Sequence, residues 1–238
     1  LKSYPEAKMA KSEKEILAAF SFIEVAERSG LIIKIGDWVC RKVISQLAIW
    51  QNEIATDIQV SVNISSLQLQ QPDLADKIYS YLQEHRVSPR NLIIEVTESM
   101  IIHSVEIAAR TLKQLREMGI RIALDDFGTG YSSLSLLREL PIDILKIDKS
   151  FIRTIDDSTH DFTIAQTIIG LGGNLGKTVI AEGVETADHM RILRDHACYL
   201  QQGFYFSRPL PFAQLIGYFQ KNEPAIATLC EYSQSNGS

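Results

Sequence analysis

The hydrophobic positions of the chain form two kinds of segment that alternate along it. Six short runs are rich in apolar or β-branched residues, a composition typical of strands. They are Gln59–Ser65, Leu92–Thr97, Arg121–Phe127, Ile144–Asp148, Thr178–Val184 and Tyr199–Ser207. Between them, apolar residues recur at helical spacing near 72–86, 102–118, 132–139, 161–175 and 187–196, and a first long helix is expected near Trp38–Trp50.

This alternation predicts a parallel sheet with crossover helices, and several of the strands are apolar on both faces, as buried parallel strands are. An open doubly wound sheet gathers its ligand contacts at one switch point, whereas a barrel takes them from the ends of many strands. Polar residues stand at or near the end of every run: Asn63, Glu95, Asp125 with Asp126, Lys146, Glu182 and Gln202. We therefore expect an α/β fold of the TIM-like (β/α)8 barrel type.

A barrel of this type has eight strands, and the runs described above all follow residue 55. The segment before the first long helix is too short and too polar for the others, so we expect the first strand or strands to be absent from the sequence. We expect residues 1–20 to be an N-terminal remnant or flexible segment, 21–221 the barrel domain and 222–238 a C-terminal tail. The missing initiator Met predicts that residue 1 is not the start of the gene product.

The composition of the chain limits the classes of function that it can have. The chain has 238 residues, 45% of them hydrophobic, enough for one large core. Its net charge is −5, which argues against binding to a DNA or RNA backbone. No apolar run approaches the roughly 20 residues that span a bilayer, so we expect no membrane contact and a cytoplasmic location. Cys40, Cys198 and Cys230 lack zinc-site spacing and are interpreted as buried thiols.

In a barrel, the polar residues at the strand ends would converge on one mouth. Carboxylate and amide oxygens are the ligands that hard cations prefer, so we expect Mg²⁺ or Mn²⁺ there. The neighbouring carboxylates of Asp125 and Asp126 suit a two-metal site. Lys146 would offset charge on a phosphate and orient or deprotonate a bound water. Cations together with a lysine favour phosphodiester hydrolysis.

Simpler interpretations exist for the same residues. Asn63 could be a turn residue, and Lys146 could form a local ion pair with Asp148. Asp125 and Asp126 could cap a helix, and Glu182 and Glu185 could be solvated loop charges. The glycine-rich stretch 170–177 lacks phosphate-loop spacing and is interpreted as a helix end and turn. Surface or capping roles are assigned to His85, His103, His160, His189 and His196.

Six ordered motifs resemble those of one family, the EAL domains, which are cyclic di-GMP phosphodiesterases. The motifs are Ser61–Ser65, Glu95–Glu98, Asp125–Gly130, Leu145–Asp148, Ala181–Glu185 and Gln202–Gly203, and the resemblance runs from Phe22 to Pro211. It implies an EAL-type barrel that hydrolyses cyclic di-GMP to linear pGpG with two metal ions.

The resemblance also implies roles for individual residues. Asn63, Glu95 and Asp125 would hold one metal, and Asp125, Asp126 and Glu182 the second. Lys146, Glu185 and Gln202 would position the attacking water, with Glu182 counted among the catalytic groups. Glu98 would anchor the substrate loop formed by Phe127, Gly128, Thr129 and Gly130.

One departure from the family leaves the function open. The family carries Glu-Ala-Leu on an early strand, followed by an Arg that meets a substrate phosphate, and neither is found here. The alternative to an enzyme is a catalytically impaired EAL domain that acts as a cyclic di-GMP receptor or a protein-interaction module. The chain could also be an excerpt of a larger signalling protein with an upstream GGDEF or sensor domain, and family members commonly form homodimers.

Overall fold

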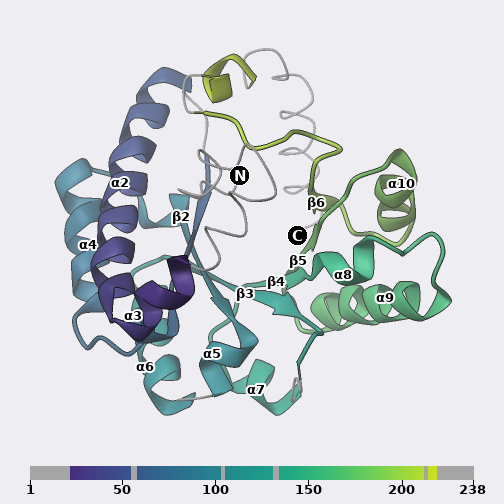
Figure 1. Ribbon diagram of the computed structural model, residues 1–238, viewed down its shortest axis with the longest axis horizontal. Helices are drawn as coiled ribbons and strands as arrows, with labels where there is room; N and C mark the ends of the chain where they lie inside the picture. Colours follow the sequence, from purple (N-terminus) through teal and green to yellow (C-terminus); the bar gives the residue numbers. More distant parts are fainter. Residues whose placement is uncertain (1–21, 55–57, 103–104, 131–133, 212–213, 219–238) are drawn as a thin grey trace.

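A computed structural model describes residues 22–54, 58–102, 105–130, 134–211 and 214–218 (Figure 1). In these residues six strands form one parallel sheet, in which spatial order follows chain order from first to last. The strands are β1 (Val60–Asn63), β2 (Leu92–Thr97), β3 (Arg121–Phe127), β4 (Ile144–Ile147), β5 (Thr178–Glu182) and β6 (Leu200–Gln202). A doubly wound sheet would reverse its strand order, so the TIM-like class is confirmed as a curled half-barrel.

Helices cover the outer side of the curled sheet, and Figure 1 shows them spread along its arc from α2 and α4 to α9 and α10. They are α2 (Leu31–Ile54), α3 (Ser66–Leu69), α4 (Leu74–His85), α5 (Glu98–Ile102), α6 (Val105–Glu117), α7 (Leu134–Glu139), α8 (Lys149–Ile152), α9 (Thr159–Asn174) and α10 (Ala187–Asp195). The helix expected near 102–118 is confirmed as α6, and the sequence does not predict the short helix α5 that precedes it. The ranges expected for the N-terminal segment and the tail lie outside the described residues.

The two faces of the sheet carry different side chains because successive residues of a strand point to opposite sides. Outward residues such as Val62, Ile94 and Leu145 belong to the large core shared with the helices. Inside the curl, a separate small cluster forms from Ile93, Ala123, Ile144 and Ile180. Two residues further along each of these strands, the same face carries Glu95, Asp125, Lys146 and Glu182. The strand period therefore places four ionisable side chains directly above an apolar layer.

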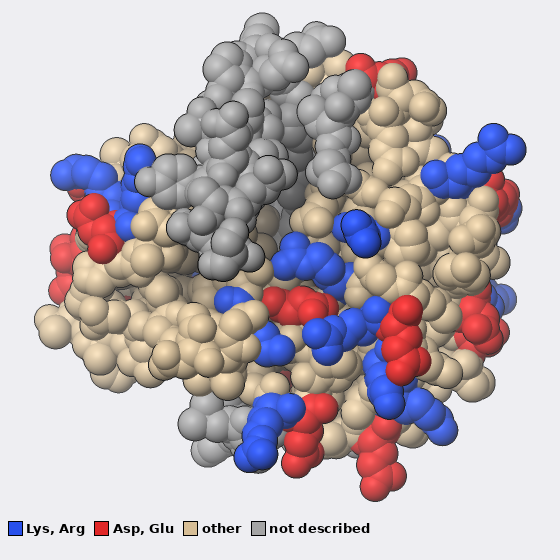
Figure 2. Space-filling model, turned by 180° about the vertical axis from the view of Figure 1, so that it is seen from behind, with Lys and Arg blue, Asp and Glu red and all other residues tan. Residues whose placement is uncertain are grey.

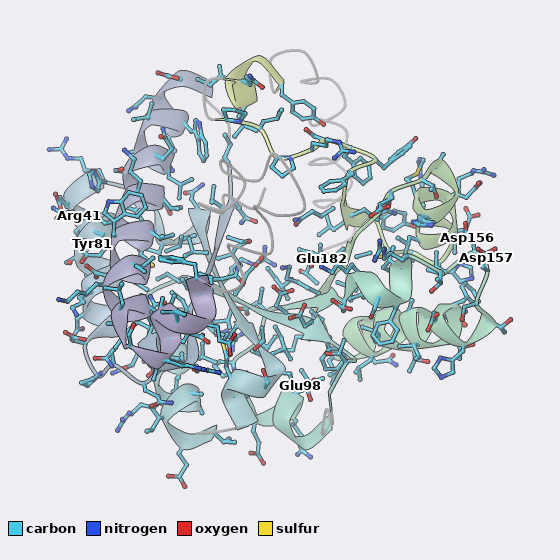
Figure 3. The ribbon with its side chains drawn as sticks, viewed as in Figure 1. Arg41, Tyr81, Glu98, Asp156, Asp157 and Glu182 are labelled. Carbon is cyan, nitrogen blue, oxygen red and sulfur yellow. The ribbon has the colours of Figure 1, made fainter. Side chains whose placement is uncertain are left out.

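A polar contact joins α2 to α4 on the outside of the sheet. The Tyr81 hydroxyl donates a hydrogen bond to Asp37 Oδ1 over 2.8 Å, and the Arg41 guanidinium lies 5.6 Å from the Tyr81 ring centre (Figure 3). Arg41 also pairs with Glu84 at 2.9 Å. Desolvation and the bond to Asp37 raise the pKa of Tyr81 to about 12, so the hydroxyl remains a donor at physiological pH. This contact holds α2 against α4, while α2 also packs beside β1.

The strand expected over Tyr199–Ser207 is too long, because β6 ends at Gln202. The Val184 N–H donates to the Gln202 carbonyl over 3.1 Å, and the Tyr205 N–H donates to the Val184 carbonyl over 3.0 Å. A Cβ atom on Gly203 would overlap the Val184 backbone. The chain therefore turns back at Gly203, where this close approach leaves no room for a side chain.

A Gly203→Ala variant is expected to lose about 1–3 kcal/mol of unfolding free energy, because the added methyl group forces the Val184 backbone to move. The matched control is Gly170→Ala inside α9, where a Cβ meets no atom within 4 Å. Alanine there is expected to stabilise the protein by about 0.5–1 kcal/mol. Urea unfolding of both variants measures the difference, and equal effects would contradict the packing at Gly203.

Other sequence predictions have clear outcomes in the described residues. Cys40 and Cys198 are buried, and burial raises the pKa of both thiols to about 12, so they are inert as expected; Cys230 lies outside the described residues. The glycine-rich stretch is the end of α9 followed by a turn, with Gly176 at φ +62°. Among the described helices, none has the length and apolar character needed to cross a membrane. On the face shown in Figure 2, Lys and Arg are interspersed with Asp and Glu.

Candidate active site

Lys146 stands at the centre of a cluster of carboxylates inside the curl of the sheet. Its Nζ atom lies 2.9 Å from Glu95 Oε1, 2.9 Å from Asp125 Oδ1 and 2.5 Å from Glu182 Oε1. The four residues come from β2, β3, β4 and β5, and Lys146 is only 1% exposed. The local pair with Asp148 is not formed, because Asp148 caps α8 by accepting the Ser150 N–H at 2.9 Å.

Among the described residues, the Lys146 ammonium faces three carboxylates, all of them buried. Buried ionised groups are costly unless opposite charge and hydrogen bonds compensate them. Divalent cations would add positive charge beside these carboxylates, and oxygen-only ligands match the preference of Mg²⁺ and Mn²⁺. The donor set therefore fits the metals that the sequence predicts.

Asp126 reaches the same cluster because β3 is irregular at this point. In a regular strand Asp126 would point away from Asp125. Instead the register against β4 shifts between Leu124 and Phe127, and Asp126 adopts a φ of 55°. As a result, carboxylate oxygens of Asp125, Asp126 and Glu182 all lie within 4.8 Å of one another, close enough to share a cation. Bulges and left-handed residues of this kind gather at functional sites.

The two amide side chains predicted for the site stand at strand ends beside carboxylates. Asn63 ends β1 and pairs in register with Glu95, while Gln202 ends β6 and pairs with Glu182. Neighbouring strands in register present their side chains on the same face, so both amides flank the Lys146 cluster. Glu95 itself stands two residues before the end of β2, where the barrel interior keeps it 1% exposed.

The loop after the aspartates packs against α5, α8 and α9. Glu98, the first residue of α5, is buried, and a Cβ on Gly130 would lie 3.1 Å from its Oε2 atom (Figure 3). The Thr129 hydroxyl donates to the Asp126 carbonyl over 2.9 Å. Gly128, at φ +100°, lies against Phe151 and Ile168, and Phe127 is buried. These contacts place Glu98 against the loop that the sequence assigned to the substrate.

Glu185 lies in the exposed loop after β5, and its backbone N–H donates to Nδ1 of His189 at 3.5 Å. Of the surface or capping roles expected for His189, the surface role does not hold, because the side chain is 4% exposed, whereas its hydrogen bonds at the start of α10 are those of a capping residue. The sequence did not predict the burial of His189, because a histidine three residues after a helix cap has neither metal-site nor catalytic spacing. Three other histidines lie at or beside helix ends, namely His85, His160 and His196. His103 lies outside the described residues.

Comparison with known proteins identifies the family. The EAL domain model matches residues 7–209, which is most of the chain. The chain therefore belongs to the EAL domain family.

Its relatives include signalling proteins and solved enzymes. The chain is 45% identical over 190 residues to the signaling protein YkoW of Bacillus subtilis, covering 80% of this chain and 24% of YkoW. A solved structure of the PaMucR phosphodiesterase, in complex with c-di-GMP, superposes with a TM-score of 0.79 at 39% identity, covering 82% of this chain and 79% of that one. A manganese and cyclic di-GMP complex of Klebsiella pneumoniae BlrP1 gives a TM-score of 0.69 at 31% identity, covering 74% and 44%. The chain spans about a quarter to a third of the curated relatives that it matches.

Proposed function

We propose that this chain hydrolyses one phosphodiester bond of cyclic di-GMP, giving linear pGpG, with Mg²⁺ or Mn²⁺ as cofactor. The observation that carries the proposal is the cluster in which Glu95, Asp125 and Glu182 surround the Lys146 ammonium, with Asp126 beside it. The relationship to the PaMucR phosphodiesterase, solved with c-di-GMP, supports the choice of substrate.

The metal ligands divide into two groups that share Asp125. One cation would be held by Asn63, Glu95 and Asp125. The other would be held by Asp125, Asp126 and Glu182, whose carboxylate oxygens lie within 4.8 Å of one another. When bound, the two cations supply Lewis acidity at the phosphate and lower the pKa of bound water. The bulge at Asp126 is what allows β3 to contribute a second carboxylate.

The remaining groups position and polarise the reactants. Lys146 is held by three carboxylates, so its ammonium is fixed in place and can offset negative charge that develops on the phosphate. Glu185 and Gln202 would orient the attacking water, the first from the exposed loop after β5 and the second from the end of β6. Glu98 would keep the loop 127–130 at the mouth, where it can cover the substrate.

A second candidate is a receptor that binds cyclic di-GMP without cleaving it. It is favoured by one observation, that no Glu-Ala-Leu triplet occurs anywhere in the 238 residues. The three carboxylates around Lys146 favour the enzyme instead, together with the bulge that brings Asp126 to them, because strained backbone of this kind gathers at catalytic sites. The homodimer and the upstream sensor or GGDEF domain stay predictions.

Incubation with cyclic di-GMP separates the two candidates. In the presence of Mn²⁺ or Mg²⁺ the enzyme is expected to form one product, a linear dinucleotide with a single terminal phosphate, which chromatography and mass measurement identify. EDTA is expected to stop the reaction. Saturable binding of cyclic di-GMP with no product at either metal would support the receptor and contradict the enzyme.

A further inference from the structure

The segment that carries Glu185 runs into the start of α10, and its geometry is that of a modified capping box. Thr186 is the N-cap residue, and its side-chain oxygen accepts the N–H of His189 at 3.1 Å. In a capping box the side chain of the third helical residue, usually Glu or Gln, accepts a hydrogen bond from the backbone N–H of the N-cap residue. Here the third residue is His189, and its Nδ1 atom accepts the N–H of Glu185, one residue before the cap.

Burial makes this arrangement specific, because a buried imidazole needs partners for both ring nitrogens. On the other side of the ring, Nε2 lies 3.6 Å from Asp156 Oδ1. Asp156 belongs to the connection between α8 and α9, and Figure 3 shows it beside α10. With Nδ1 accepting a hydrogen bond, a neutral ring carries its hydrogen on Nε2, facing the Asp156 carboxylate. The imidazole therefore links the Glu185 backbone to Asp156, in the connection between α8 and α9.

The residues before Glu185 are held just as closely. Gly183 has a φ of +72°, and a Cβ atom added to it would lie 2.5 Å from the Cβ of Lys149, the first residue of α8. Val184 donates its N–H to the last residue of β6, Gln202, and accepts the N–H of Tyr205 in the turn that follows. His189 adds the next contact along the segment, because it accepts the backbone N–H of Glu185.

We propose that His189 is a positioning residue for Glu185. By accepting the Glu185 N–H, it fixes the peptide plane at that residue and so the direction in which the carboxylate leaves the backbone. His189 itself does not touch the reacting atoms. The inference rests on the proposed function, in which Glu185 orients the attacking water.

Two variants test the role of the ring acceptor. His189→Gln restores the ordinary capping-box residue and keeps an acceptor for the Glu185 N–H, whereas His189→Phe keeps the size of the ring and removes the acceptor. In the Phe variant kcat is expected to fall about 10–100-fold, with KM changed less than about threefold, because only the orientation of Glu185 is lost. The Gln variant is expected to keep kcat within about threefold of the wild type. Equal losses in both variants, or none in the Phe variant, would overturn the proposal.

Amide hydrogen exchange at Glu185 provides a readout that does not depend on turnover. The Glu185 N–H is expected to be protected in the wild type and the Gln variant, and to exchange at least about tenfold faster in the Phe variant. An unprotected Glu185 amide in the wild type would contradict the proposal even if the Phe variant failed to fold. If the wild type cleaves no cyclic di-GMP while the exchange pattern is as expected, the proposed function fails and the contact of His189 with Glu185 stands.

Discussion

Lys146→Met is expected to lose at least about a thousandfold in turnover, because it removes the fixed cation that faces the substrate phosphate. It is also expected to cost about 3–5 kcal/mol of unfolding free energy in metal-free protein, since three buried carboxylates lose their shared partner. Manganese should recover part of this stability, because it neutralises the same carboxylates, but not the turnover. Urea unfolding with and without Mn²⁺ and the rate of pGpG formation measure the two effects.

The matched control is Lys113→Met on the outer face of α6. Lys113 is an exposed lysine whose Nζ lies 3.9 Å from Glu117, so its loss is expected to change stability by less than about 0.5 kcal/mol and to leave turnover unchanged. A Lys146→Met protein as stable as this control in the absence of metal would show that the buried carboxylates do not depend on Lys146.

The Glu182→Gln variant is expected to bind metal more weakly while it still folds. In metal-free protein the variant should have a stability close to that of the wild type, because Glu95 and Asp125 still pair with Lys146. In the wild type, Mn²⁺ at a hundredfold excess over its dissociation constant should add about 2.7 kcal/mol. For a domain of this size, that raises the melting temperature by about 5–10 °C. The variant should lose most of this rise and at least about a hundredfold in turnover.

Melting curves with and without Mn²⁺ test this prediction, with Glu117→Gln as the control. Glu117 is exposed on α6, so its amide variant should respond to Mn²⁺ as the wild type does. An equal rise in melting temperature for Glu182→Gln and the wild type would mean that Glu182 does not bind the metal.

Most of the fold could be predicted because each strand is marked by its own residues. The runs that begin at Leu92 and Arg121 gave two strands with the observed bounds, and parallel strands joined by helices left few topologies to choose from. The length of β6 could not be predicted, because it ends through the contact of Gly203 with the Val184 backbone, which joins distant parts of the chain.

The composition of the candidate site could also be predicted, but not how it is held together. Glu95 and Asp125 follow Ile93 and Ala123 by the strand period of two, which places them inside the curl. The φ of 55° at Asp126 has no equivalent signal, since Asp occurs in many conformations. The burial of His189 likewise depends on Asp156, which is 33 residues earlier in the chain and reaches it only after folding.

The initial rate of pGpG formation from cyclic di-GMP, measured for the wild type and Lys146→Met with Mn²⁺ and again with EDTA, tests the proposed enzyme most directly. Turnover is expected in the wild type with Mn²⁺, at a rate at least about a thousandfold lower in Lys146→Met with Mn²⁺, and in neither protein with EDTA. Turnover in the Lys146→Met protein at the wild-type rate, or turnover that persists in EDTA, would contradict a metal-dependent mechanism built on the carboxylates around Lys146.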